Sequence, residues 1–545
     1  MRQRRSTIIN SALLLIALFS GAFLFENKAI AKSSNQKISL YADTEISTLD
    51  ASKITERNSF IQMDNFGEGL YTYDKNGKPH KALATKVKLS KDKKTYTINM
   101  RKNTKWSNGA QVTAKDFVYS WQRAVDPATQ GEYAYLFENI ENTKDVANGK
   151  KKPSTLGVKA TGKYQLKVKL VKPQQYFKMI LARETLFPLN QKFVEKYGKS
   201  YGTSSKKTLY NGPFVSSGWT GTSLHWKLKR NPYYWDKKHV KLRQIKYSVI
   251  KEPSTAYNLY QTHKLDQISL VGEQAKQLAG NKDIVQRQLA ATNYLEYNLK
   301  NNSGLENVNI RRAISLAINR KQIANRILQN GSKPASNFVP RRVAYNPKTK
   351  EDFYKEGIVA NTASYHKKLA QKLFKRGLKQ IGKKHLNLRL ITSDTDTSKQ
   401  VADFLQSQLE TNLPQLDISL RKVPANNRIS SVNKGDFDID YTGWSADFAD
   451  PYTFLQIFPT NSAQNNTGWS NKEYDQAIDD SLNKNAGNKE KRWADLITAE
   501  KVLMKAQGVT PLFQLNNEDL VNPKLKGVSY DRINGHYIYK KAYLK

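Results

Sequence analysis

An acidic and aromatic segment at 435–451, GDFDIDYTGWSADFADP, holds the residues best suited to ligand chemistry. A short strand is predicted to lead into a Gly-Trp turn flanked by aspartates. Trp444 and Phe448 would lower the dielectric constant around Asp447, and a desolvated carboxylate is costly unless it meets a cation. We therefore predict that Asp447 receives a ligand ammonium group. The alternative interpretation of the segment is a solvated loop.

The sequence lacks the usual enzyme and cofactor motifs. It contains no GxSxG, P-loop or EF-hand spacing, and Gly67-Glu68-Gly69 does not continue into a dinucleotide fingerprint, because Thr72 replaces the third glycine. There is no cysteine, which excludes disulfides, thiolate nucleophiles, iron–sulfur clusters and zinc ribbons. The seven histidines stand at least 14 residues apart, so no local metal signature exists. We expect a protein that is not an enzyme and has no cofactor or metal.

The elements that position this segment follow from hydrophobic periodicity. Alternation of period two predicts strands at 95–100, 164–170 and 245–250. Helical spacing predicts helices at 310–318 and from about 490 to 505, and it puts Arg311, Arg312 and Arg320 on the polar face of the first. The turn-rich segments 142–157 and 331–350 are expected to be irregular. Interleaved strands and helices without a fixed repeat indicate an α/β chain.

The N-terminus has the three regions of an export signal. Arg2, Arg4 and Arg5 precede an apolar run of 14 residues, 12–25, and Ala29-Ile30-Ala31 offers a cleavage site. We predict cleavage after Ala31, because the run is shorter than the ~20 residues of a membrane span. An uncleaved anchor is the alternative. With no cysteine, a lipid anchor is not expected.

The charge balance is strongly positive, with 89 basic residues against 47 acidic ones, a net charge of +42. Export removes nucleic acid as the default partner. Because the basic residues are spread along the whole chain, most are interpreted as a solvated face. Retention of the protein on an anionic cell-wall polymer is the second interpretation.

Eight segments in a common order resemble the extracellular solute-binding proteins of the oligopeptide-binding family, which serve ABC importers. They are YTINMRKNTKWSNGAQVTAKDFVYSWQRAVDP (96–127), GVKATGKYQLKVKLVKP (157–173), NGPFVSSGW (211–219), LKRNPYYW (228–235), NYLEYNLKN (293–301), NIRRAISLAINRKQI (309–323), GWSADFADPYTFL (443–455) and NNTGWSNKEYD (465–475). The resemblance covers nearly all of the chain after the predicted cleavage point.

The resemblance implies an α/β, two-lobed fold like that of type II periplasmic binding proteins, with an extra subdomain and a ligand cleft between the lobes. Hinge closure would bury the ligand. The implied segments are the signal peptide 1–31, lobe I 32–78, the extra subdomain 79–185, lobe I again 186–292, lobe II 293–505 and a last part of lobe I 506–545.

The resemblance also implies a peptide site. Members of the family usually hold the ligand backbone as an added strand, and an aspartate matching Asp447 usually pairs with the peptide α-ammonium. The implied ligand-binding residues are Asp447, Trp444, Ser445, Asn465, Tyr133 or Tyr135, and Tyr294. For the tyrosines, packing in the core or on the surface is the alternative. Arginines that meet the peptide carboxylate in enteric members are replaced here by Val432 and Tyr441, so recognition of the ligand C-terminus stays open.

The predicted function is capture of oligopeptides for the permease and ATPase subunits of an ABC importer. The exported protein would be extracellular, wall-associated or periplasmic. One alternative is the same fold with another ligand, such as a peptide pheromone, haem, a nickel chelate or an oligosaccharide. Another is a basic cell-surface adhesin, and an enzyme is the most distant alternative. An ammonium-bearing ligand is favoured because Asp447 lies in an aromatic setting.

Overall fold

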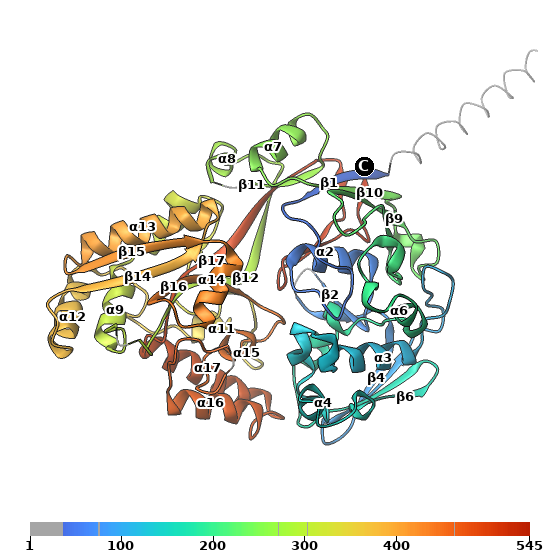
Figure 1. The fold of residues 1–545 in the computed structure, drawn as a ribbon, viewed down its shortest axis with the longest axis horizontal. Helices are drawn as coiled ribbons and strands as arrows, with labels where there is room; N and C mark the ends of the chain where they lie inside the picture. Colours follow the sequence, from blue (N-terminus) through green and yellow to red (C-terminus); the bar gives the residue numbers. More distant parts are fainter. Residues whose placement is uncertain (1–35, 75–76, 271, 302, 463) are drawn as a thin grey trace, which may run out of the picture.

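The computed structural model describes residues 36–74, 77–270, 272–301, 303–462 and 464–545. The predicted signal peptide lies outside this range. Two bodies of helices and sheets lie side by side and are joined by long strands (Figure 1). We call them lobe I, which holds two four-stranded sheets, and lobe II, which holds a seven-stranded sheet. No helix in the described ranges is both long and apolar enough to span a membrane.

Lobe I is built on a mixed sheet whose first and second strands are parallel although about 200 residues separate them. Its strands, in sheet order, are β1 (Lys37–Ala42), β10 (Gln244–Val249), β9 (His225–Arg230) and β8 (Phe214–Ser217). Helix α2 (Arg57–Phe66) is buried along most of its length. The C-terminal residues return to this lobe, where Gln36 bonds the backbone of Leu544.

The second sheet of lobe I is antiparallel and lies against helix α3 (Ala114–Val125). Its strands, in sheet order, are β4 (Ala84–Leu89), β5 (Thr95–Met100), β7 (Gln165–Lys169) and β6 (Val158–Gly162). Helix α3 begins at a capping box in which Asp116 accepts from the backbone N–H of Thr113 at 2.6 Å. Trp121 of this helix is fully buried. A short hairpin, β2 (Tyr71–Tyr73) with β3 (Pro79–Lys81), lies nearby.

Lobe II is a mixed sheet covered by helices. Its strands, in sheet order, are β11 (Gln267–Leu270), β17 (Val509–Val521), β12 (Ile284–Tyr297), β16 (Ile439–Ser445), β14 (Leu386–Ser393) and β15 (Leu416–Val423), with β13 (Lys333–Pro334) on β17. The main helices are α9 (Val308–Ala317), α12 (Lys367–Gln380), α13 (Asp396–Asn412), α16 (Lys472–Leu482) and α17 (Lys489–Lys505). A core of aliphatic side chains, Leu388 and Leu405 among them, fills the space between the sheet and α9, α12 and α13.

Two long strands, β12 and β17, run from the junction of the lobes into lobe II (Figure 1). They pair antiparallel, but their register is interrupted between Gln288 and Thr292. At the interruption, the N–H of Ala290 donates to the carbonyl of Arg532, and the carbonyl of Ala290 accepts from the N–H of Ala446. The backbone here therefore bonds to two other segments instead of to β17.

The strands and helices predicted from periodicity are confirmed, with end points that differ by one or two residues. The predicted Gly-Trp turn is wrong, because Gly443 and Trp444 lie within β16 and pair with β12. The expected irregular segment 142–157 contains a short helix, α4 (Thr143–Ala147). The placement of Arg311 and Arg320 on a polar face is wrong. Both are buried, and Arg311 donates to the carbonyls of Leu305, Ala506 and Gln507 at 2.7–2.9 Å.

Both arginines are buried because they donate to backbone carbonyl groups at helix ends and turns; Arg320 donates to those of Ser315, Ile318 and Pro511 at 2.6–3.3 Å. Burial lowers the pKa of Arg311 to about 10, but the side chain stays charged at neutral pH. The segment boundaries predicted for the lobes stay a prediction.

Candidate functional site

Asp447 lies just after β16, where the chain turns toward α15 (Tyr452–Leu455). Its side chain is buried, and its Oδ2 accepts a hydrogen bond from the hydroxyl of Tyr135 at 2.9 Å. Tyr135 belongs to lobe I, in the 3-10 segment η2 (Glu132–Phe137), and is 312 residues away in sequence. The backbone N–H of Asp447 donates to Thr453 Oγ1 at 3.0 Å. Thus Asp447 is held in lobe II and contacts lobe I.

The electrostatic setting of Asp447 is unusual for a buried carboxylate. Within the described residues, no Lys, Arg or His side chain forms an ion pair with it. Burial raises the pKa of Asp447, while the charge of Arg183 and the hydrogen bond from Tyr135 act in the opposite direction. The carboxylate is therefore desolvated with only distant compensation, which is the condition for binding a ligand cation.

Arg183 is the residue near this site that the predictions missed. It is 3% exposed, and its guanidinium lies 5.1 Å from the ring centroid of Phe60. Its Nε lies 3.4 Å from Glu184 Oε2, yet Nε and Nη1 have no hydrogen-bond partner in the described part of the chain. Unpartnered buried donors are costly and mark a place where a ligand carbonyl or water would bind. The signal was an Arg-Glu pair inside the apolar run MILARETLFPL at 179–189.

Aromatic rings from both lobes surround the carboxylate. Tyr133 packs against Phe60 and Tyr135, with ring centroids 5.3 Å and 5.6 Å apart. Across the lobes, Tyr176 stacks on Phe448 at 4.6 Å with an interplanar angle of 3°. Asp447 is 8% exposed beside these rings, and of the two aromatic residues predicted from the sequence to surround it, Phe448 takes part in this packing.

The other predicted site residues lie in different surroundings. Trp444 donates its Nε1–H to the carbonyl of Thr453 at 2.9 Å, and Ser445 is exposed at the end of β16. Asn465 donates to three carbonyl groups of its own loop, of which that of Trp469 is the closest at 2.8 Å. Tyr294 is 2% exposed and bonds Glu296. The structure thus brings Asp447, Trp444, Tyr133 and Tyr135 together, and it engages Asn465 and Tyr294 in loop and core packing.

Strand β16 has one edge that is only partly paired. It pairs with β12 along its whole length, from Ile439 to Ser445, but with β14 only at Ile439 and Asp440. No strand among the described residues covers the remaining edge at 441–445, where Gly443 and Ser445 are exposed. An extended segment could add to this edge through main-chain hydrogen bonds, ending at Asp447.

A second buried ionic cluster lies beneath the site in lobe I. His536 Nδ1 is 2.7 Å from Asp64 Oδ2 and 3.2 Å from Glu184 Oε1. Burial alone would lower the pKa of His536, but its hydrogen bonds to the two carboxylates raise it to about 9. Tetrahedral metal ligands stand ~3.3 Å apart when their bonds are ~2.0–2.1 Å, so the 2.7 Å contact suits a shared proton. We therefore interpret the cluster as a protonated histidine between two carboxylates and not as a metal site.

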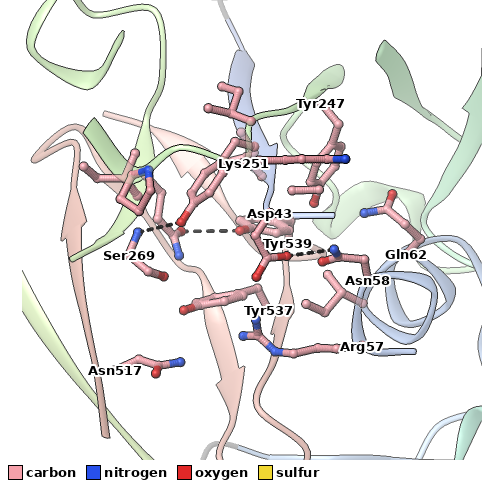
Figure 2. Close-up of a pocket in the computed structure, with 18 residues that line it drawn as sticks. Asp43, Arg57, Asn58, Gln62, Tyr247, Lys251, Ser269, Asn517, Tyr537 and Tyr539 are labelled. Atoms are coloured by element: carbon pink, nitrogen blue, oxygen red, sulfur yellow. Dashed lines mark hydrogen bonds between the residues drawn. The ribbon is translucent and has the colours of Figure 1, made fainter. Parts of the chain in front are cut away.

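A separate cavity of about 280 Å³ lies beside α2 (Figure 2). It lies where β1 and β10 end, and Asp43, Arg57 and Lys251 are among the residues that line it. Asn58 donates to Asp43 Oδ1 at 2.9 Å across this cavity. None of the site residues predicted from the sequence lines it.

The chain resembles proteins whose names describe peptide binding. Residues 78–466 match the family described as bacterial extracellular solute-binding proteins, family 5 Middle. A dipeptide-binding protein of Lactococcus lactis subsp. cremoris is 38% identical, over 94% of this chain and 96% of the relative.

Solved structures give the same result. Listeria monocytogenes OppA bound to peptide is 39% identical, with a TM-score of 0.82 over 94% of this chain and all of that one. The pheromone receptor PrgZ, solved to show its mode of peptide binding, is 38% identical, with a TM-score of 0.82 over 94% of this chain and 99% of that one. The predicted two-lobed α/β fold is confirmed by these likenesses.

Proposed function

The chain belongs to the bacterial extracellular solute-binding proteins, family 5, and we propose that it captures peptides between its lobes and delivers them to an ABC-type importer. As a member of a solute-binding family, it is a binding protein and not an enzyme. The observation that carries the proposal is Asp447, a buried carboxylate without a direct cationic partner among the described residues, at the contact between the lobes.

The ligand ammonium group supplies the charge that Asp447 lacks. A peptide α-ammonium within hydrogen-bond distance of Oδ1 or Oδ2 would compensate the burial that raises the pKa of the carboxyl group. Tyr135 donates to Oδ2 and holds the carboxylate in one orientation. Nη1 of Arg183 is buried without a hydrogen-bond partner in the described chain, which supports a role as donor to a main-chain carbonyl of the ligand.

The ligand backbone adds to the open edge of β16. Main-chain hydrogen bonds do not depend on side-chain identity, so this edge gives affinity for many sequences. The strand direction and the position of Asp447 at its end support a ligand that lies along 441–445 with its N-terminus at Asp447.

Closure of the lobes completes the site, because Tyr135 and Tyr176 come from lobe I and Asp447 and Phe448 from lobe II. The permease and ATPase subunits would sense the closed form. The family is extracellular, and we add the proposal that the net charge of +42 retains the protein on an anionic wall polymer. A peptide pheromone is a second candidate ligand, since the pheromone receptor PrgZ is among the similar structures.

A double-mutant cycle tests the ammonium anchor. Asp447→Asn keeps the size of the side chain, and N-acetylation of a test peptide removes the ligand charge. Each change alone should weaken binding roughly a hundredfold or more, because breaking one side of a buried pair costs ~3–5 kcal/mol. Together they should be far less than additive. Isothermal titration calorimetry gives the four affinities.

Asp396→Asn is the matched control, because the Asp396 side chain is 95% exposed on α13 and removal of its charge should leave affinity unchanged. Equal affinity of the wild-type protein for free and acetylated peptide would show that Asp447 is not the anchor. Native mass spectrometry of the purified protein would identify the class of any ligand that co-purifies.

A further inference from the structure

One helix of lobe II gathers more positive charge than its length accounts for. Helix α12 and the turn after it, residues 367–384, hold eight Lys and Arg residues, against about three expected from the 89 basic residues in the whole chain. No Asp or Glu occurs from 357 to 393. The eight cations are all exposed, and we call them the α12 basic patch: Lys367, Lys368, Lys372, Lys375, Arg376, Lys379, Lys383 and Lys384.

The cations of this patch are not paired within the protein. In the described part of the chain, no ion pair involves any of the eight. The ion pairs that lie nearest in the sequence use other residues, since Lys355 pairs with Glu351 and Arg389 pairs with Asp436. The charge of the patch therefore does not hold lobe II together.

The positive charge is also placed where it weakens the helix. The N-terminus of a helix favours acidic residues, yet α12 begins with Lys367 and Lys368 and has no acid in its first turn. Lys368, Lys372 and Arg376 follow one another at intervals of four residues, where like charges repel. Helices α13, α16 and α17 of the same lobe each carry an acid in the first turn. The stability of the helix therefore does not explain the charge of α12.

Packing against α9 fixes the direction in which the patch faces. At Gly377 the two helices approach so closely that a Cβ would lie 2.5 Å from Cγ1 of Ile310. Phe374 and Leu378 are buried in the core of lobe II, so the apolar side of α12 is already covered. A basic amphipathic helix binds a lipid bilayer by burying its apolar side. That side is covered here, and the charged side alone meets the solvent.

The α12 basic patch lies at the outer end of lobe II, on the side away from lobe I (Figure 1). Asp447 instead lies at the contact between the lobes, where it accepts from Tyr135 of lobe I. A partner bound along α12 would therefore leave the peptide site free. The 14 residues of α12 extend over about 21 Å, at ~1.5 Å per residue. A row of charges of this length suits an extended partner better than a single small ion.

The composition of the patch indicates the chemistry of that partner. Seven of the eight cations are lysines. Lysine is depleted in protein–protein interfaces, which favour aromatic residues, Met and Arg. Its ammonium group binds phosphate as a compact point charge. A polymer with phosphates in a row would meet several lysines at once and release its own bound counter-ions, which favours binding at low salt.

We propose that the α12 basic patch binds a linear phosphate polymer and is the site that retains the protein on an anionic cell wall. This inference gives a place to the wall retention in the proposed function and rests on it. Capture of peptides at Asp447 does not depend on it, because the two sites lie at opposite sides of lobe II.

The test measures the affinity for a fluorescently labelled linear polyphosphate by anisotropy at several salt concentrations. The quadruple variant with Lys368→Gln, Lys372→Gln, Lys375→Gln and Lys379→Gln should bind at least tenfold more weakly than the wild type at low salt. The slope of log affinity against log salt concentration should become shallower by about 3, at ~0.7 for each cation removed. The pair Lys372→Gln with Lys379→Gln should give about half of that change.

The matched control removes the same charge from the exposed side of the antiparallel sheet of lobe I. It combines Lys86→Gln, Lys88→Gln, Lys159→Gln and Lys167→Gln, at exposed positions on β4, β6 and β7. This variant should keep the affinity for polyphosphate within threefold of the wild type. Thermal melting verifies that both quadruple variants fold, and both should bind peptide like the wild type in calorimetry.

Equal losses in the two quadruple variants would overturn the inference, since binding would then follow the overall charge. Absence of polyphosphate binding by the wild type would also overturn it. Displacement by inorganic phosphate at equal phosphate concentration would assign the patch to a small ion, and displacement by phosphatidylglycerol vesicles would assign it to a membrane; either result overturns the polymer site. Peptide binding that depends on Asp447 would leave peptide capture intact in each case, and its absence in the wild type would reject peptide capture whatever α12 binds.

Discussion

Asp447 and Asp450 stand three residues apart and are both buried, but their partners differ. Asp450 accepts from Nη1 and Nη2 of Arg492, both at 2.8 Å, and from the N–H of Tyr452 at 3.0 Å. Asp447 accepts from a neutral hydroxyl, that of Tyr135. The comparison shows that the neighbouring residues in the sequence do not decide which role a buried aspartate has. A buried carboxylate that pairs with an Arg or Lys of the same chain stabilises the fold. A buried carboxylate without such a partner is available to a ligand.

The largest expected effect is on the stability of Asp450→Asn. Removal of one side of a buried ion pair typically costs ~3–5 kcal/mol, because the other charge is left stranded. Asp447→Asn should instead leave the free energy of unfolding of the ligand-free protein unchanged or raise it by about 1 kcal/mol, since it removes a desolvated charge and keeps an acceptor for Tyr135. Urea denaturation measures both.

The control for stability is Asp436→Asn. The Asp436 side chain is 46% exposed and pairs with Arg389 and Arg421 at the surface. Exposed pairs contribute ~0–1 kcal/mol, so this variant should unfold almost like the wild type. If Asp447→Asn proved as destabilising as Asp450→Asn, the distinction between the two aspartates would be wrong.

Acidification should give the next largest effect, this time on affinity. The pKa of Asp447 in the free protein is raised, and a peptide ammonium binds only the ionised form. Affinity should therefore be full above that pKa and fall about tenfold for each pH unit below it, beginning above the pH of about 4 where an ordinary aspartate titrates. Calorimetry at a series of pH values measures this. The residual binding of Asp447→Asn should lack the dependence, and a parallel decline in both proteins would contradict the assignment.

The smallest effect concerns the hydroxyl that joins the lobes. Tyr135→Phe removes the hydrogen bond to Asp447 and should weaken peptide binding about fivefold, in line with the ~1 kcal/mol of one hydrogen bond. Tyr133→Phe is the matched control, because Tyr133 contributes ring packing to the same wall. Equal losses in the two variants would show that the hydroxyl of Tyr135 has no special role.

The sequence predicted the features that depend on residues close together along the chain. Alternation and helical spacing located β5, β7, β10, α9 and α17, and residue types alone singled out Asp447. Periodicity could not predict the partners of Arg311, because the carbonyls of Ala506 and Gln507 lie about 195 residues away. For the same reason, no spacing rule could join His536 to Asp64 and Glu184. Long-range charge pairing depends on how distant segments pack, which local patterns do not record.

The interruption between β12 and β17 is a point at which an otherwise hydrogen-bonded two-stranded ribbon can bend. A ribbon resists stretching and shearing, so we expect the lobes to move along one arc. At the interruption, Ala290 bonds the backbone of Arg532, near the C-terminus, and that of Ala446, which precedes Asp447. One residue at the interruption thus joins the C-terminal segment to the segment that carries Asp447. If every peptide held at Asp447 closes the lobes about this point, the importer needs to recognise only one closed shape for many cargoes.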